Sequence, residues 1–260
     1  MLLLGCVLLA VARGMGSDGW KKLPEPKQPG AFPLPRLMDA DYRISWSGAK
    51  AGEVTVHYSR LIGGDLRFDA EGKSTGLARG LWRLDATHSA VADPVTLRPR
   101  KTRQKEVYQN ETVTTEVKFE EEKAVRRRET KPPDGSKVKD KRFKLPLLFD
   151  IHGGLLFVRS QKLVKGEVMR FLVFPTDSPY LGKVTVLGRE KVKVGAGSYA
   201  AIKCDLALQR IDKKGKIVPH ADFKKAQAWF SDDADRLLLK IDSEIFIGSV
   251  RVELESVKFR

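Results

Sequence analysis

Cysteine is scarce in this sequence of 260 residues, with Cys6 and Cys204 as its two occurrences. Cys6 lies in an apolar leader that we expect to be removed, and a mature chain with one thiol forms no internal disulfide. Export therefore cannot be argued from cysteine pairing. Cys204 lies in the alternating stretch 199–208, where we predict a small buried hydrophobic side chain and not a nucleophile.

The sequence also lacks the common motifs of catalytic and metal sites. Its histidines form neither an H-E-x-x-H nor an H-x-x-E-H arrangement, they have no cysteine companions for zinc, and no G-x-S-x-G elbow is present. The glycine-rich stretch 195–197 separates two strand patterns and predicts a hairpin turn, not a phosphate-binding loop. The sequence therefore predicts no catalytic residue, no metal site and no cofactor. The four histidines are His57, His88, His152 and His220.

Two adjacent carboxylates, Asp232 and Asp233, follow a strand pattern that ends on Trp229 and Phe230. Paired carboxylates can act as general acid and base or hold a cation, but adjacent residues of an extended chain point apart. We interpret the pair as part of a turn in which one carboxylate accepts hydrogen bonds from backbone N–H groups.

The apolar run at the start of the chain, residues 1–12, reads MLLLGCVLLAVA. It is too short to span a bilayer, which takes about twenty apolar residues, and it ends in the A-x-A pattern that signal peptidase recognises. We therefore predict a signal peptide over 1–12 and an exported protein. Residues 13–40, in which Pro and Lys are concentrated, predict an extended tether.

A lipoprotein signal is the alternative interpretation of the same leader. No Lys or Arg precedes the apolar run, although the signal-peptide pattern includes such residues. If translation starts upstream, Leu3-Leu4-Gly5-Cys6 resembles a lipoprotein signal, in which Cys6 becomes the lipidated first residue and anchors the protein to a membrane. Both interpretations place the protein in the cell envelope, either in the periplasm or anchored to a membrane.

The charge balance is strongly basic, with a formal net charge of +15 at pH 7, which suits a partner that carries phosphates. Basic residues outnumber acidic ones between residues 98 and 144, and the densest run is Arg126, Arg127 and Arg128. Because three glutamates shortly precede that run, we interpret the block as a solvated hairpin, with an anionic envelope surface as the alternative partner. Aromatic residues are not regularly interleaved with the basic ones, so we expect no nucleic acid.

From residue 41 onward the dominant pattern has a period of two, which is typical of strands with one buried face. About twelve strands result, and a single antiparallel sheet of that width curls or closes. We therefore predict a mainly all-β fold, in which a large curved antiparallel sheet forms an open or closed barrel. The predicted strands are 42–47, 53–60, 66–72, 81–88, 103–109, 112–120, 123–130, 183–194, 199–208, 226–231, 237–244 and 248–259.

The stretch 145–164 breaks this alternation, because long apolar side chains crowd together in it. Several of them can share one helical face, so we predict a short helix over 150–161, although Gly153-Gly154 weakens its first turn. A helix this apolar must be buried, and the concave side of the sheet is the large apolar surface available. We therefore predict a single domain over 41–260, with the helix plugging or lining the barrel.

Four segments carry a family resemblance. They read YRISWSGAKAGE at 42–53, DIHGGLLFVRSQKL at 150–163, VLGREKVKVGAGSYAA at 186–201 and AWFSDDADRLLLKIDSEIFIGSVRVEL at 228–254. In this order and spacing they resemble the bacterial family known as domain of unknown function 3108, over roughly 41–259. The resemblance implies an exported protein whose curved antiparallel sheet wraps around an interior, similar to lipoprotein-carrier barrels. It carries over no catalytic residues.

Arg159 stands out among the charged residues, because the predicted helix is apolar and an unpaired guanidinium is costly to bury. It could form an ion pair with a strand carboxylate, it could extend to solvent, or it could meet the anionic head group of a ligand in the interior. We predict that Arg159, Phe157, Leu156 and Trp46 line a ligand site.

These observations favour an exported envelope protein, without enzymatic activity, that binds a lipid or a lipoprotein acyl chain in an apolar interior. An envelope scaffold whose interior is filled by its own helix is the alternative, and polyanion binding through residues 98–144 is a weaker one. The first two hypotheses differ in empty volume: an apolar pocket between helix and sheet would favour a carrier, and a packed interior would favour a scaffold.

Overall fold

The computed structural model describes residues 28–146, 148–212, 215–218, 223–245 and 248–260. The predicted leader 1–12 with Cys6, the first part of the tether (13–27) and His220 lie outside the described residues. The described chain forms fifteen strands and two helices. In that part of the chain, neither helix combines the length and the apolar character that a membrane span requires.

The strands form two consecutive antiparallel meanders, in which strands that are neighbours in the chain pair with each other. The first meander consists of β1 (Met38–Trp46), β2 (Ala49–Arg60), β3 (Leu66–Ser74), β4 (Leu84–Ala92), β5 (Pro99–Tyr108), β6 (Thr112–Glu120), β7 (Lys123–Lys131) and β8 (Lys137–Phe143). The second consists of β9 (Val168–Val173), β10 (Tyr180–Val194), β11 (Gly197–Ile211), β13 (Phe223–Ser231), β14 (Leu238–Ile245) and β15 (Ser249–Phe259), with the short β12 (Ile217–Val218) paired to β11.

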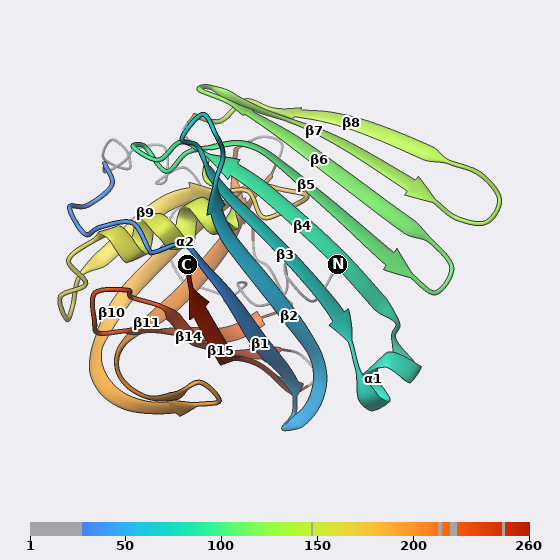
Figure 1. Ribbon diagram of the computed structural model, residues 1–260. Coiled ribbons are helices and arrows are strands. Elements are labelled where there is room, and N and C mark those ends of the chain that lie inside the picture. Colours follow the sequence, from blue (N-terminus) through green and yellow to red (C-terminus); the bar gives the residue numbers. More distant parts are fainter. Residues whose placement is uncertain (1–27, 147, 213–214, 219–222, 246–247) are drawn as a thin grey trace.

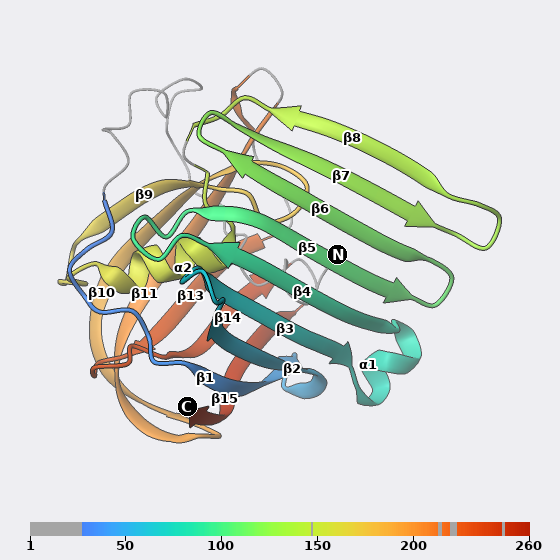
Figure 2. The ribbon, with the colours of Figure 1, turned by 45° about the horizontal axis from the view of Figure 1, so that its top comes forward.

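The two meanders form one sheet, because the first and last strands of the chain, β1 and β15, pair with each other. The sheet order is β8-β7-β6-β5-β4-β3-β2-β1-β15-β14-β13-β11-β10-β9, so β8 and β9 are its edges. The sheet curls around a concave interior, and β5–β8 extend away from the rest of the molecule (Figures 1 and 2). The predicted fold, a large curved antiparallel sheet, is confirmed, and the barrel is an open one.

Burial alternates along most strands, as the period of two predicts. In β2, Val54, Val56 and Tyr58 are buried, whereas Thr55 and His57 between them are partly exposed. Cys204 in β11 is fully buried among apolar neighbours, as predicted. The β10–β11 hairpin turns at residues 195–197, which confirms the interpretation of its glycines.

Several elements differ from the sequence-based expectation, among them the short β12, which was not predicted. β8 was not predicted, because its sequence KVKDKRF has no apolar alternation and six of its seven residues are exposed at the sheet edge. β9 was not predicted either, because its sequence VMRFLV lacks alternation and follows the helix. The strand predicted over 81–88 begins at Leu84, since Gly76–Leu81 forms a short helix, α1, that has no buried residue.

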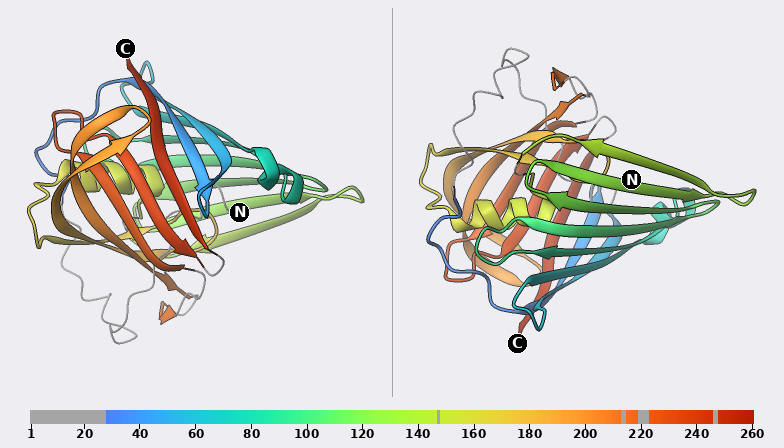
Figure 3. Two further views of the ribbon diagram at one scale, coloured as in Figure 1. Left: turned by 90° about the horizontal axis from the view of Figure 1, so that it is seen from below. Right: turned by 90° about the horizontal axis from the view of Figure 1, so that it is seen from above.

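The helix α2 (Ile151–Ser160) lies in the concave interior, on the link from β8 to β9 (Figure 3). It begins after Asp150, whose Oδ1 accepts a hydrogen bond from the Gly153 N–H at 2.7 Å and so caps the first turn. Gln161 caps the other end. The predicted helix over 150–161 and its position inside the sheet are confirmed.

Gly153 and Gly154 allow α2 to lie close against its neighbours. A Cβ atom on Gly153 would lie 2.7 Å from the carbonyl oxygen of Leu97, and one on Gly154 would lie 3.1 Å from Cε2 of Phe171. The glycines lower the intrinsic helix propensity of the first turn, but their missing side chains permit the close packing.

We expect Gly153→Ala to lower the free energy of unfolding by about 1–3 kcal/mol, the usual cost of overpacking a close-packed site. Gly80 in α1 is the matched control, because no atom lies within 4 Å of the position its Cβ would take. Gly80→Ala should raise the free energy of unfolding by about 0.4–1 kcal/mol. Urea unfolding followed by circular dichroism measures both, and equal effects would contradict the close packing of α2.

Candidate ligand-binding site

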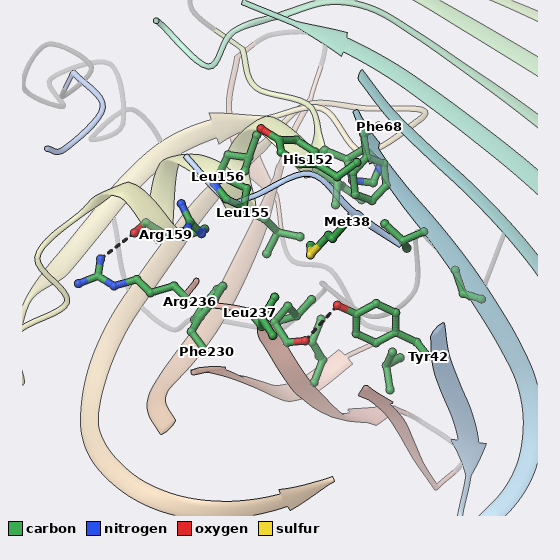
Figure 4. A pocket seen from close by; sticks show the side chains of 18 of the residues that line it. Met38, Tyr42, Phe68, His152, Leu155, Leu156, Arg159, Phe230, Arg236 and Leu237 are labelled. Atoms are coloured by element: carbon green, nitrogen blue, oxygen red, sulfur yellow. Dashed lines mark hydrogen bonds between the residues drawn. The ribbon is translucent and has the colours of Figure 1, made fainter. Parts of the chain in front are cut away.

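An apolar cavity of about 160 Å³ lies between α2 and the sheet (Figure 4). Its sheet walls come from β1–β3 and from β13–β15, so the cavity lies where the two meanders join. Leu155 and Leu156 of α2 form the opposite wall. Side chains of the sheet that line the cavity include Met38, Ile44, Val56, Phe68, Ile241 and Val252.

A smaller apolar cavity of about 40 Å³ lies on the side of α2 that faces β9–β11. Ile151, Leu155 and Phe230 line both cavities. Empty apolar volume is therefore present on both sides of the helix, and Leu155 borders it on each side.

The polar groups in the wall of the larger cavity fall into two kinds. The Tyr42 hydroxyl donates a hydrogen bond to the carbonyl oxygen of Leu238 at 3.0 Å, and burial raises the pKa of Tyr42. The Tyr58 hydroxyl and Nη2 of Arg159 are instead buried without a hydrogen-bond partner among the described residues. Burial raises the pKa of Tyr58 to about 12, and Arg159 lies close enough for its charge to oppose that shift. These two groups form what we call the polar corner.

Arg159 is 5% exposed and is held by backbone carbonyl groups. Its Nε donates to the carbonyl oxygen of Asp235 at 2.8 Å, and its Nη1 donates to that of Pro33. The Asp235 carboxylate binds the exposed Arg36 instead. Burial lowers the pKa of Arg159 to about 10. Arg159 thus forms no ion pair with a strand carboxylate among the described residues, and it does not extend to solvent. Its charge is buried beside the cavity.

The turn after β13 positions the loop that contacts Arg159. Oδ1 of Asp233 accepts hydrogen bonds from the N–H groups of Asp235 at 2.9 Å and Arg236 at 3.0 Å, which confirms the predicted role of the carboxylate pair. The Arg236 guanidinium in turn donates to the carbonyl oxygen of Arg159 at 2.7 Å (Figure 4). The loop and the end of α2 are thus fixed to each other.

Residues 28–37, the described part of the predicted tether before β1, pack across the same end of α2. The Gly30 N–H donates to Oγ of Ser160 at 2.9 Å, and the Arg236 guanidinium lies 3.5 Å from the centre of the Phe32 ring. Pro35 lines the cavity. Where the sequence suggested an extended tether, this segment packs on the folded domain and contributes Pro35 to the cavity wall, and β1 begins at Met38.

His152 lines the cavity from the first turn of α2, and its ring stacks on Phe68 with centroids 3.6 Å apart (Figure 4). Its other neighbour is His88 of β4, at 4.7 Å between ring centroids. Burial lowers the pKa of His88 to about 4 and holds that of His152 well below its ordinary value. Burial raises the pKa of the neighbouring Asp150 to about 6. No sequence pattern indicates this cluster, because His88 lies far from Asp150 and His152 in the chain.

The four residues predicted to line a ligand site separate into two pairs. Leu156 and Arg159 line the cavity. Phe157 lies on another face of α2, 2% exposed, and packs on Phe149 and Phe171 with ring centroids 5.1 and 5.4 Å apart. Trp46, the last residue of β1, is 38% exposed and does not line the cavity. Tyr58 was not predicted, because an alternating strand does not reveal which hydroxyl lacks a partner.

The basic run of β7 divides between the two faces of the sheet. Arg126 is 4% exposed, and its Nη1 donates to Oδ1 of Asp177 at 2.7 Å. Arg128 also donates to Asp177, at 2.9 Å, whereas Arg127 faces outward and pairs with Asp140 at 3.5 Å. Two members of the predicted anion patch thus tie β7 to the β9–β10 loop, and an anionic partner on this hairpin would meet Arg127.

The fold and the cavity define an open, β-barrel-like protein with an apolar interior. The chain belongs to the family of proteins of unknown function DUF3108, whose model matches residues 41–255. The resemblance of the four sequence segments is thus confirmed. No curated protein sequence matches the chain.

Solved structures that are similar to this chain include the following three. A β-barrel-like protein of domain of unknown function DUF1849 from Brucella abortus has a TM-score of 0.55 and 11% identity, over 88% of this chain and 99% of that one. A predicted exported protein with a YmcC-like fold from Bacteroides fragilis has a TM-score of 0.32 and 9% identity, over 88% and 99%. A predicted lipoprotein from Parabacteroides distasonis has a TM-score of 0.34 and 8% identity, over 89% and 100%. Of the three, the first is similar enough to support the fold, and it supports the fold alone.

We expect Asp177→Asn to lower the free energy of unfolding by about 1–3 kcal/mol, because it leaves the buried Arg126 without a charged partner. Asp140→Asn is the matched control, since Arg127 and Asp140 are 59% and 61% exposed, and it should change the free energy by less than about 0.5 kcal/mol. Urea unfolding measures both. A control substitution as costly as Asp177→Asn would show that burial does not distinguish the two pairs.

Proposed function

We propose that the protein is an exported component of the bacterial cell envelope that binds the apolar chain of an amphipathic envelope molecule, a lipid or a lipoprotein acyl chain, in the cavity between α2 and the sheet. The proposal rests on an apolar cavity that Tyr58 and Arg159 line, since each of these residues also has a buried polar atom without a partner among the described residues, Oη of Tyr58 and Nη2 of Arg159. Ligand sites combine these features, an apolar lining and a few polar groups that orient the ligand.

The size of the cavity limits what it can hold. Its volume of about 160 Å³ is close to that of an engineered apolar cavity of about 150 Å³ that binds benzene. A short stretch of alkyl chain fits, and each methylene group that leaves water for such a site contributes about 0.8 kcal/mol. A longer chain would have to pass Leu155 into the second cavity or leave through the open side.

The polar corner favours an anionic head group, a carboxylate or a phosphate. An anion there would accept a hydrogen bond from the Tyr58 hydroxyl and from Nη2 of Arg159, which lack other partners among the described residues. Hydrogen bonds between ionised groups are stronger than neutral ones, and the gain is larger where water is excluded. The same head group would balance the buried charge of Arg159.

The location in the envelope and the absence of catalysis are parts of the proposal that come from the sequence. Export rests on the leader 1–12, and lipidation of Cys6 would add a membrane anchor. The proposed role is to bind and hold a ligand, without a chemical step.

An envelope scaffold that binds no ligand is the second candidate. The packing of Phe149, Phe157 and Phe171 on one side of α2 is the kind of filled interior that a scaffold requires. The two candidates differ in the role of the larger cavity, which is lined almost entirely by apolar groups and which a scaffold would leave unused.

Filling the cavity tests the proposal. Leu155 borders both cavities, so the indole of Leu155→Trp would occupy their volume, and we expect affinity for dansyl-labelled undecanoic acid to fall by at least about tenfold, which is about 1.4 kcal/mol. Leu77→Trp is the matched control, because Leu77 is 87% exposed on α1. Fluorescence titration measures affinity, and near-ultraviolet circular dichroism checks the fold. Wild-type protein that binds no probe, or a folded Leu155→Trp variant that binds it equally well, would favour the scaffold.

The polar corner has its own test. We expect Tyr58→Phe to leave stability unchanged or to raise it, since it removes a buried hydroxyl without a partner. The ratio of the affinity for a fatty acid to the affinity for the fatty alcohol of equal length should fall by about 5–10-fold. Tyr42→Phe is the matched control in the same cavity. It removes the hydrogen bond to the carbonyl oxygen of Leu238, so it should lower the free energy of unfolding by about 1 kcal/mol. It should leave the ratio of the two affinities unchanged. A ratio that responds equally to both substitutions would refute the role of Tyr58.

A further inference from the structure

Three buried side chains with metal-binding groups meet beside the cavity. His88 comes from β4, Asp150 caps α2 and His152 lies in the first turn of α2, and they are 8%, 2% and 7% exposed. One possible ligand atom from each residue lies within 4.8 Å of those from the other two. The fold therefore brings together two imidazoles and a carboxylate that no sequence motif connects.

Each of the three residues has a buried polar atom without a hydrogen-bond partner among the described residues: Nε2 of His88, Nδ1 of His152 and Oδ2 of Asp150. The other oxygen of Asp150 is occupied, because it accepts the N–H of Gly153 at 2.7 Å. Buried polar groups in folded proteins nearly always have a partner, and an unexplained exception can indicate an ion or a water. Three such atoms in one cluster point to one shared species that binds all of them.

We propose that His88, Asp150 and His152 bind a divalent transition-metal ion. Two imidazole nitrogens and one carboxylate oxygen suit ions such as Zn²⁺, whereas Ca²⁺ and Mg²⁺ prefer oxygen ligands. Bonds of about 2.0–2.2 Å in tetrahedral geometry place ligand atoms about 3.3–3.6 Å apart, so side-chain movements of about 1 Å would close the present spacing. Three protein ligands leave a fourth position for water or for a molecule in the cavity, which His152 lines.

The surroundings of the cluster support this assignment. The side chain of Gln104 in β5 lies beside His88, close enough to interact with its imidazole ring. Metal-binding histidines are commonly oriented by such neighbours through their second nitrogen. Phe68 stacks on His152 and holds the second imidazole in place. The inference concerns a different group of atoms from the polar corner and does not depend on the proposed function.

Zn²⁺ is the probe for the test. Protein purified without a histidine tag and freed of metal with a chelator is titrated with zinc chloride by calorimetry, and metal content is measured by mass spectrometry. We expect one Zn²⁺ per chain, a higher Tm in the presence of Zn²⁺, and loss of affinity by more than about 100-fold in His88→Gln, since substitutions of residues behind the ligands already cost about 10–100-fold. His57→Gln is the matched control, because His57 lies on β2 and pairs with Asp39 at 2.6 Å.

A second variant, Asp150→Asn, keeps the proposal testable if His88→Gln does not fold. Asp150→Asn keeps an oxygen that can cap α2 but removes the charge, so the fold should be retained while Zn²⁺ binding weakens by at least about tenfold. X-ray absorption of the loaded wild-type protein should show nitrogen and oxygen ligands at about 2.0–2.2 Å and no sulfur. Wild-type protein that binds no Zn²⁺, or a His88→Gln variant that binds it as tightly as His57→Gln, would overturn the proposal and leave a buried water as the shared partner.

Discussion

The structure depends on how the concave face of a very wide sheet is covered. Two meanders joined through β1 and β15 curl around an apolar interior, and their outer edges, β8 and β9, do not pair with each other. The link between those edges enters the interior as α2, so one helix must bury the concave face of both meanders. Gly153 and Gly154 let it pack closely on one side. One short helix cannot fill the whole width, and the remaining space is the cavity.

Each end of α2 carries polar groups that follow from this position. At its first turn, the Asp150 cap and His152 come against His88 of β4. At its last turn, Arg159 donates hydrogen bonds to the loop after β13 and to Pro33 of the segment 28–37. The helix therefore places a possible metal site at one end of the interior and a buried positive charge at the other. A ligand in the cavity would lie along the apolar face between them.

Local patterns in the sequence predict most of the fold but little of the site. Alternation identified strands such as β2, and the apolar stretch around Leu155 identified α2. β8 was not predicted, because an exposed edge strand needs no apolar face.

Of the site residues, Arg159 could be identified from the sequence, because a charged residue in an apolar helix needs a partner or access to solvent. The neighbours Leu156 and Phe157 could not be told apart, since the rotation of α2 is set by contacts with distant residues such as Phe171. Tyr58 and His88 could not be identified from the sequence. Each has a buried polar atom without a hydrogen-bond partner among the described residues, and this can be recognised only when all of its spatial neighbours are known.

We propose that the space beside α2 holds part of an amphipathic molecule. Native mass spectrometry of the protein, extracted gently from cells that produce it, tests this proposal. We predict chains that carry one adduct of lipid mass, and its loss after unfolding and refolding in lipid-free buffer. Chains that carry no adduct, from cells in which the protein is abundant and folded, would refute this role and indicate a scaffold with an unused cavity.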